Sequence, residues 1–269
     1  MTVCKFSSEI TAFAHKLAAA SAQVTLPLFR TPLSADNKAG EGEFDPVTIA
    51  DRDAEEAMRQ LIRTAYPDHG IEGEEHGNED SDAEYVWVLD PIDGTRAFIS
   101  GLPLWGTLIG LKYKGEPIFG LMHQPFTGET FCGSTFAGEK ADAQFYRADA
   151  RTRLRTSTRT LLTEATISTT SPRIFTDMER TAYDRVERAC RLARYGYDCY
   201  AYAMVAAGHI DLVVEAGLKP CDIVALVPII KAAGGVVTSW TGGPVTDGGT
   251  ALAAANPQLH EAALALLNA

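Results

Sequence analysis

Tyr85-Val86-Trp87-Val88-Leu89-Asp90-Pro91-Ile92-Asp93-Gly94-Thr95 is the most informative stretch of this sequence. Its first five residues are apolar or aromatic, a run typical of a buried strand. Pro91 and Gly94 then impose an abrupt turn. The predicted strand therefore ends on two aspartates, and buried carboxylates are costly unless something neutralises them.

Magnesium explains this pair of aspartates well, because it prefers oxygen ligands and commonly uses a few carboxylates together with water and phosphate. The carbonyl of Ile92 lies between the two acids and adds a neutral oxygen. Gly94 and Thr95 would present backbone N–H groups at the start of a helical turn over residues 96–99, and such groups attract phosphate. Taken alone, the segment also fits an ordinary strand and turn with an aspartate helix cap.

Composition limits the possible functions. The chain has 269 residues, of which 46% are hydrophobic, so it has ample material for a buried core. Its formal net charge of −11 opposes a general attraction to nucleic acid or to an anionic membrane. An acidic protein that handles an anionic substrate needs local positive charge, and bound metal ions are one source of it.

The five cysteines are scattered without a Cys-x-x-Cys pair, which argues against a disulfide framework and against a thiolate zinc site. Glu9, His15 and Lys16 interrupt the alanine-rich N-terminal stretch, so it is not expected to be a signal peptide. No apolar run reaches transmembrane length. We therefore expect a cytoplasmic protein.

The apolar periodicity predicts a mixed α/β or α+β protein with layered sheets and helices. Residues 141–160 lose this periodicity, which suggests two halves, 1–145 and 146–269, in one compact catalytic unit. The arginines of that segment, at positions 147, 151, 153, 155 and 159, favour a solvated loop or edge over a binding patch. The expected helices are 10–28, 51–66, 178–194, 200–207, 222–233 and one starting at Asn256-Pro257; the expected strands are 85–89, 106–113, 117–122, 165–169, 211–215, 236–238 and 251–254.

Four motifs occur together over nearly the whole chain: Asp45-Pro46-Val47-Thr48-x-x-Asp51, Gly73-Glu74-Glu75, Asp90-Pro91-Ile92-Asp93-Gly94-Thr95, and Cys221-Asp222 before an apolar helix and Gly234-Gly235. In order and spacing they resemble the inositol monophosphatase superfamily. The resemblance implies a layered α-β-α-β-α sandwich. It also implies a metal-dependent phosphoric monoester hydrolase, and relatives are commonly homodimers.

The resemblance further implies a site. Two or three Mg²⁺ ions would be held by Glu74, Asp90, the Ile92 carbonyl, Asp93 and Asp222. Asp51, Thr95 and Glu74 would carry catalysis by metal-activated attack of water, and Gly94 and Thr95 would bind the phosphate. A plainer interpretation makes Asp222 a helix N-cap and Asp51 a first-turn acid. Signatures of P-loop, zinc-protease and serine-hydrolase sites are absent from the sequence.

The substrate is suggested by other segments. The stretches 96–107, 122–129, 195–202 and 214–220 look like the histidinol-phosphatase branch, which implies a role in histidine biosynthesis. Histidinol phosphate carries an ammonium group, so its pocket should offer carboxylates beyond the metal ligands. Asp198 and Glu215 are the candidates, with a helix cap and a solvated strand end as their alternatives. An inositol-1-monophosphatase or sugar phosphatase is the second hypothesis, and a non-catalytic metal-binding protein is the third.

Overall fold

Two β-sheets and three layers of helices make up the protein. The structure is a computed structural model that describes residues 3–32, 36–37 and 46–269. Asp45 of the first motif lies outside these residues. A short antiparallel ribbon joins β1 (Asp36–Asn37) to β2 (Pro46–Val47). None of the described helices is long and apolar enough to cross a membrane.

The larger sheet has eight strands in the order β10-β9-β8-β7-β6-β5-β3-β4. All neighbours are antiparallel except β3 and β5, which are parallel. The strands are β3 (Gly70–Gly73), β4 (Gly77–Glu79), β5 (Tyr85–Asp93), β6 (Gly106–Tyr113), β7 (Glu116–Gln124), β8 (Glu129–Ser134), β9 (Asp142–Arg147) and β10 (Ala150–Arg153). This sheet places the acidic end of β5 near its centre.

The smaller sheet has five strands in the order β12-β11-β13-β15-β14. Strand β11 runs parallel to β12 and β13, and β15 runs antiparallel to β13 and β14. The strands are β11 (Thr166–Thr169), β12 (Leu192–Tyr195), β13 (Leu212–Leu218), β14 (Val236–Thr238) and β15 (Gly249–Ala254). The chain passes from one sheet to the other between Arg153 and Thr166, somewhat after the expected division at 145/146.

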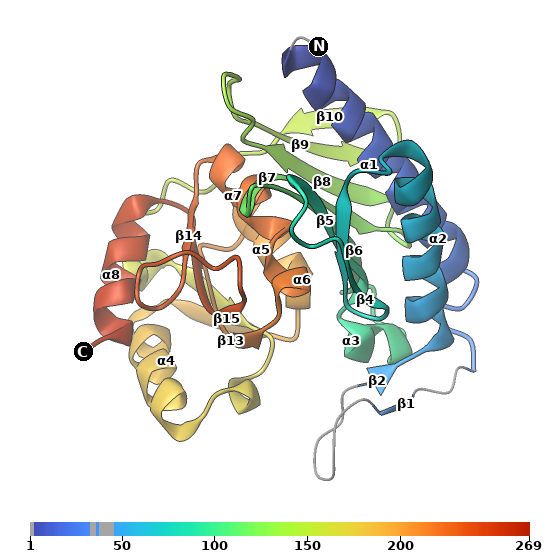
Figure 1. The fold of residues 1–269 in the computed structure, drawn as a ribbon. Helices are drawn as coiled ribbons and strands as arrows, with labels where there is room; N and C mark the ends of the chain where they lie inside the picture. Colours follow the sequence, from blue (N-terminus) through green and yellow to red (C-terminus); the bar gives the residue numbers. More distant parts are fainter. Residues whose placement is uncertain (1–2, 33–35, 38–45) are drawn as a thin grey trace.

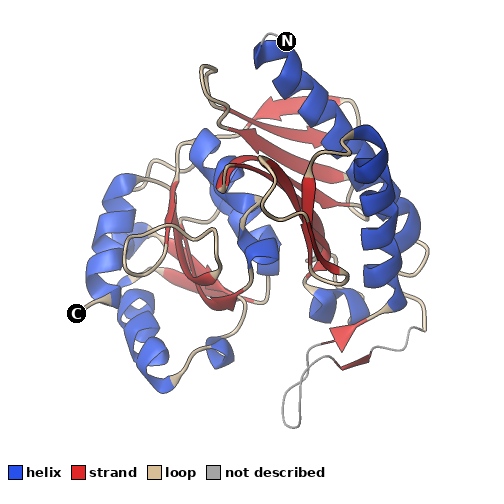
Figure 2. Ribbon diagram, viewed as in Figure 1, coloured by secondary structure: helices blue, strands red, loops and turns tan. Residues whose placement is uncertain are grey.

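Helices and sheets alternate as an α-β-α-β-α sandwich, which confirms the expected fold class (Figures 1 and 2). The outer layers are α1 (Val3–Thr25) with α2 (Ile49–Ala65) on the larger sheet, and α4 (Asp177–Ala189) with α8 (Pro257–Leu267) on the smaller sheet. The middle layer holds α5 (Asp198–Ala206), α6 (Pro220–Ile223) and α7 (Leu226–Ala233). The short elements α3 (Thr95–Ile99), η1 (Leu162–Glu164) and η2 (Pro172–Ile174) complete the described fold.

A row of glycines brings the middle layer close to the larger sheet. Gly110, Gly120 and Gly133 lie opposite one another on β6, β7 and β8. A Cβ atom added at Gly120 would lie 1.7 Å from the Ala225 carbonyl oxygen, so only glycine permits this approach. The close packing draws the preceding helix α6 against β5 and β6. Residues 220–223 are thereby brought to the acidic end of β5.

Most expected elements are confirmed, and two expectations were wrong. The helix expected over 178–194 ends at Ala189, because Arg191 and Leu192 donate their backbone N–H groups to the Ala165 carbonyl and the chain continues as β12. The helix expected over 222–233 is two helices, α6 and α7. The arginine-rich segment includes β10, a fully exposed edge strand, which agrees with the preferred interpretation of an edge.

Candidate active site

The acidic turn at the end of β5 is held by backbone hydrogen bonds. Asp90 Oδ1 accepts a hydrogen bond from the backbone N–H of Ile92, two residues later, at 3.0 Å. Asp93 Oδ2 accepts one from the backbone N–H of Cys199, in the first turn of α5, at 2.6 Å. The pairing of β5 with β6 is irregular between Asp90 and Asp93, so the turn departs from the flat ladder there. Both carboxylates therefore have fixed positions, with one oxygen each engaged.

Gly94 makes the turn into α3 possible. Its φ of 86° lies in the left-handed region, which disfavours any side chain. A Cβ atom there would also lie 3.1 Å from the Leu104 carbonyl and 3.3 Å from Cβ of Asp198. Gly94 and Thr95 both line the pocket beside Asp93, at the position expected for a phosphate.

A buried ion pair supports the loop that carries Glu74. Glu55 and Arg59 of α2 are fully buried and are joined by a 2.7 Å contact. Glu55 accepts the backbone N–H groups of Glu75 at 2.7 Å and His76 at 3.1 Å, and Arg59 reaches the Gly77 carbonyl. These bonds hold the backbone of the loop at Glu75 and His76 against α2. Glu74 is directed into the site by this scaffold.

Four acidic side chains from separate parts of the sequence converge here. Ligand atoms of Asp90, Asp93 and Asp222 lie within 4.8 Å of one another, as do those of Glu74, Asp90 and Cys221. Asp222 sits in the first turn of α6, where its Oδ2 accepts the backbone N–H of Lys219 at 2.7 Å. The N-cap of α6 is Lys219, so Asp222 is not the N-cap of the plainer interpretation; it is the third residue of the helix, accepts the N-cap N–H and also belongs to the acidic cluster.

Burial and mutual repulsion raise the pKa values of the cluster. The pKa of Asp90 lies well above its ordinary value because the carboxyl is buried and because Glu74, Asp93 and Asp222 repel its charge. Burial, with Asp198 and Asp222 nearby, raises the pKa of Asp93 in the same way. Burial raises the pKa of Asp222 to about 6. Such shifts are what a site built for a cation shows when only protein charges act on it.

The donor set fits magnesium. All four acids offer hard oxygen atoms, and the Ile92 carbonyl lies in the same turn. Lys219 Nζ lies 3.1 Å from Glu74 Oε1, and this single ammonium cannot balance four carboxylates. A divalent cation bound by a few carboxylates and completed by water and phosphate matches both the charge and the ligand type.

Asp51 and Thr95 lie at the edge of this cluster. Thr95 Oγ1 is 3.4 Å from Asp51 Oδ1 and 3.1 Å from the Ile92 carbonyl oxygen. Thr48, the N-cap of α2, donates to Asp51 Oδ2 through its backbone N–H at 2.8 Å and through its hydroxyl at 2.6 Å. Asp51 is thus a first-turn acid of α2, and its other oxygen faces Thr95.

A pocket of about 820 Å³ opens from the cluster toward the smaller sheet. Glu215, at 2% exposure, lines it and accepts the Thr170 backbone N–H at 2.6 Å, and burial raises its pKa to about 8. Asp198 lines it from the start of α5 in a left-handed conformation with φ of 44°. Burial also raises the pKa of Asp198. Neither acid belongs to the groups that could hold a metal, and a cationic part of a ligand would favour the charged form of both.

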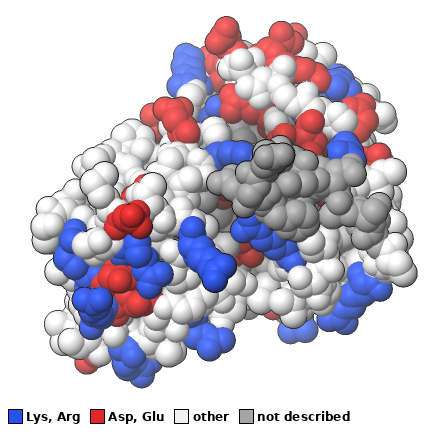
Figure 3. All heavy atoms as spheres, turned by 90° about the horizontal axis from the view of Figure 1, so that it is seen from below, with Lys and Arg blue, Asp and Glu red and all other residues white. Residues whose placement is uncertain are grey.

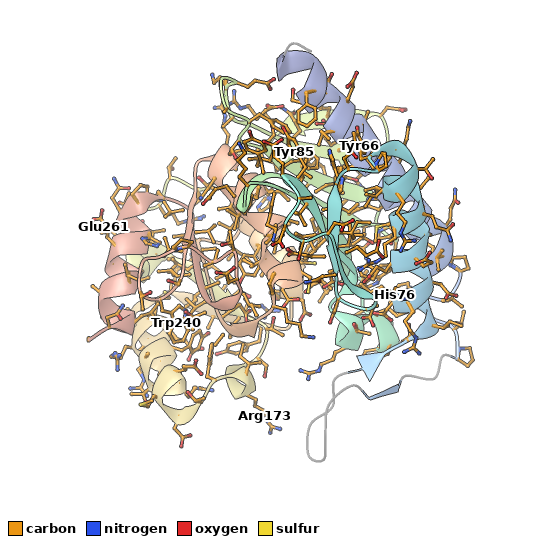
Figure 4. The ribbon with its side chains drawn as sticks, viewed as in Figure 1. Tyr66, His76, Tyr85, Arg173, Trp240 and Glu261 are labelled. Carbon is orange, nitrogen blue, oxygen red and sulfur yellow. The ribbon has the colours of Figure 1, made fainter. Side chains whose placement is uncertain are left out.

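Positive charge also borders this pocket, in the side chains of Arg96, Arg173 and Lys219. Figure 4 shows Arg173 projecting at the lower margin of the molecule, ahead of α4. Lys and Arg side chains are spread over the face seen from below in Figure 3, although the chain as a whole is acidic. The pocket therefore combines an acidic floor with a partly basic rim.

The sequence motifs located the acids but not their partners. Every acid assigned to the site lies in or beside this pocket, together with Ile92, Gly94 and Thr95. The sequence did not predict three groups: the backbone N–H of Cys199, the backbone N–H of Thr170 and the side chain of Arg173. Backbone donors, and a side chain on a distant loop, leave no signal in the spacing of local motifs. Lys219 lies in the stretch 214–220, three residues before Asp222, and this spacing could have indicated that it lies near the acidic cluster.

Comparison with known proteins was consistent with this geometry. A family model described as "Inositol monophosphatase family" matches residues 7–269. The Arabidopsis thaliana protein named "Bifunctional phosphatase IMPL2, chloroplastic" is 46% identical over 233 residues, which make up 86% of this chain and 64% of that protein. This chain thus spans less than two thirds of that relative's length. A histidinol-phosphatase of Streptomyces coelicolor is 33% identical over 262 residues, 95% of each chain. The solved structure of an inositol monophosphatase from Zymomonas mobilis has a TM-score of 0.86 and 38% identity, covering 97% of this chain and 98% of that chain.

Proposed function

The chain belongs to the inositol monophosphatase family of phosphatases, and we propose that it is a magnesium-dependent histidinol-phosphate phosphatase, which converts histidinol phosphate and water to histidinol and phosphate. One observation carries the choice of substrate: Glu215 and Asp198 line the pocket without belonging to the metal-ligand groups. The charged form of a buried carboxylate is stabilised most by a ligand that carries a positive charge. The family relationship to histidinol-phosphatases supports the same substrate.

The proposed reaction rests on a small number of groups. Magnesium, when bound by Glu74, Asp90, Asp93, Asp222 and the Ile92 carbonyl, supplies Lewis-acid activation of water and neutralises charge on the phosphate. Thr95 Oγ1 accepts a proton from the attacking water and donates its own toward Asp51 Oδ1. Thr48 holds the other oxygen of Asp51, which keeps that acceptor in place. A positioned proton acceptor of this kind contributes on the order of 10²–10⁴ in rate.

The remaining pocket residues orient the substrate. The backbone N–H groups at Gly94 and Thr95 are proposed to hold the phosphate at the turn into α3. Glu215 and Asp198 are proposed to hold the ammonium and imidazole end. Substrate binding then aligns the phosphorus atom between the acidic cluster and Thr95.

An inositol-1-monophosphatase is the second candidate function. The relative of known structure with a TM-score of 0.86 is named an inositol monophosphatase, and the acidic cluster would serve either substrate. Comparing turnover of histidinol phosphate with turnover of inositol 1-phosphate in magnesium separates the two. A higher kcat/KM for inositol 1-phosphate would reject the proposed substrate, and failure to release phosphate from any monoester would favour a non-catalytic metal-binding protein.

Glu215→Gln gives the sharpest test of the substrate. Glutamine keeps a carbonyl to accept the Thr170 N–H but loses the charge, so kcat/KM for histidinol phosphate should fall by about 10- to 100-fold, the equivalent of roughly 1.5–3 kcal/mol for a charge-assisted hydrogen bond. Hydrolysis of an aryl phosphate should change little. Glu261→Gln, on the exposed side of α8, is the matched control. An equal fall for both substrates would place Glu215 in the catalytic machinery instead.

We propose further that two or three magnesium ions bind per site and that the enzyme is a cytoplasmic homodimer acting in histidine biosynthesis. The division into a 1–145 half with most metal ligands and a 146–269 half with Asp222 also stays a proposal. Counting bound magnesium at equilibrium and measuring the mass by light scattering test the first two of these points.

A further inference from the structure

A second pocket lies across α5 from the candidate active site. Its volume is about 340 Å³, within the range of small-molecule sites, and it shares no lining residue with the larger pocket. The two pockets use different residues of α5: Cys199 and Tyr202 line the larger one, and Tyr200 and Met204 line this one. The rest of its wall comes from β8, β9, β10, the segment that follows β10, and Ala207 and His209 just after α5.

The rings of Phe145 and Tyr200 are half-buried at this pocket, and the buried ring of Phe131 packs behind them. The rings of Phe131 and Phe145 have centroids 5.0 Å apart, and Tyr200 meets Phe131 edge-on at 6.1 Å. Met204, a flexible and polarizable side chain, lies beside them. A flat ring enters such a surface with favourable aromatic and sulfur contacts.

Opposite charges lie at the edge of these rings. Arg153 and Arg155 are exposed side chains lining the pocket, and neither forms an ion pair within the part of the chain that the structure describes. Unpaired arginines in a chain of net charge −11 favour an anion, which they bind in a bidentate manner. Glu129 supplies a negative charge. Its Oε2 accepts hydrogen bonds from the Tyr200 and Thr127 hydroxyls, both at 2.7 Å, while Oε1 accepts none from a described residue.

We propose that this second pocket binds an α-amino acid with a flat, ring-bearing side chain. The carboxylate pairs with Arg153 and Arg155, the ammonium group binds Glu129 Oε1, and the ring lies against the half-buried rings of Phe145 and Tyr200. The two arginines, the unoccupied Glu129 Oε1 and the aromatic side chains match the three functional groups of such an amino acid. The pocket adjoins α5, whose first turn donates a hydrogen bond to Asp93 of the candidate active site.

Calorimetric titration of the magnesium-loaded enzyme tests this site. The probes are L-phenylalanine and L-histidine, with 3-phenylpropionate, phenethylamine and L-alanine lacking in turn the ammonium group, the carboxylate and the ring. We expect saturable binding of at least one ring-bearing amino acid, at least tenfold tighter than its incomplete analogues. The double variant Arg153→Ala/Arg155→Ala should weaken this binding tenfold or more and leave aryl phosphate hydrolysis unchanged.

Two controls make the result decisive. Arg151→Ala removes an arginine of the same strand that pairs with Asp142 and does not line the pocket, so binding should be kept. Glu129→Gln should abolish the preference for the amino acid over 3-phenylpropionate. The proposal is overturned if neither amino acid binds saturably at millimolar concentration, if the double arginine variant binds as the parent does, or if 3-phenylpropionate binds as tightly as the amino acid.

Discussion

Asp93 shows how a single carboxylate is both costly and useful in this protein. Burial disfavours its negative charge, and the neighbouring carboxylates of Asp198, Asp222 and Asp90 repel it. One strong hydrogen bond, from the Cys199 N–H, fixes the side chain without neutralising it. The residue therefore remains available to a cation, and its energetic cost is recovered only when a cation binds.

Replacing this carboxylate tests that role. Asp93→Asn keeps an oxygen that can accept the Cys199 N–H but removes one charge from the cluster, so we expect an intact fold with turnover reduced at least a hundredfold. Circular dichroism monitors the fold, and phosphate release at several magnesium concentrations measures the loss. Near-normal activity at ordinary magnesium would contradict the assignment of Asp93 as a ligand.

The pH dependence of stability follows from the same acids. Asp222 and Glu215 have folded-state pKa values of about 6 and about 8, above the ordinary values near 4. The folded state then binds more protons than the unfolded state, so stability falls as pH rises from about 4 through 6 toward 8. Without divalent ions, the free energy of unfolding should decrease from pH 5 to pH 8.

Urea denaturation in a chelating buffer measures this trend. Glu215→Gln should make the decrease between pH 6 and pH 8 smaller, by the share that Glu215 contributes, because its amide does not titrate. Saturating magnesium should flatten the part that depends on Asp222. A flat or rising stability across this range without metal would show that these raised pKa values do not govern the folded state.

At the level of elements, two helices begin with the same capping arrangement. Thr48 and Asp51 form a capping box at the start of α2, and Thr176 and Glu179 form one at the start of α4. Only the first is part of the candidate active site, because Asp51 also faces Thr95. Comparing the two capping boxes therefore distinguishes the effect of a cap on stability from its effect on catalysis.

Thr48→Ala and Thr176→Ala should each lower the free energy of unfolding, by about 0.5–2 kcal/mol as expected for loss of an N-cap. Only Thr48→Ala should also lower kcat, because Asp51 then loses the hydroxyl that holds Oδ2. Denaturation and aryl phosphate turnover measured on both variants provide the comparison. An equal effect of the two variants on kcat would remove Asp51 from the proton pathway.

The boundaries of elements were predictable where local chemistry defines them. Asn256-Pro257 predicted the start of α8, and the end of the helix expected over 51–66 lies within one residue of the end of α2 at Ala65. The end of α4 was missed because Leu192–Tyr195 continues an apolar pattern, yet pairs with β11 through contacts distant in sequence. The strands β8, β9 and β10, between Glu129 and Arg153, were missed for the same reason, since their order comes from pairing with neighbouring strands rather than from local periodicity.

At the scale of the whole molecule, the site is shared by the two sheets. Glu74, Asp90 and Asp93 belong to the larger sheet and its loops, whereas Glu215 belongs to the smaller sheet and Asp222 to α6 in the middle layer. The joint occurrence of the motifs, in the order and spacing of a known family, predicted that these residues form one site. It did not predict the glycine row that lets α7 approach the larger sheet, since the contact of Gly120 with Ala225 joins residues more than a hundred positions apart.

Magnesium should therefore stabilise the whole molecule, not only its active site. The acidic cluster joins the larger sheet to the middle layer, and its repulsion opposes that contact until a cation binds. A ligand that binds only the folded state adds about 2.7 kcal/mol at a hundred times its Kd, which for a chain of this size raises Tm by roughly 5 °C. Differential scanning calorimetry with magnesium, against sodium chloride at the same ionic strength, separates specific binding from charge screening. Asp93→Asn and Asp222→Asn should each reduce the magnesium-dependent rise, and Asp142→Asn, on β9 outside the acidic cluster, should leave it unchanged. An equal rise with sodium chloride, or the same rise in all three variants, would mean that the acids of the two layers do not share a cation.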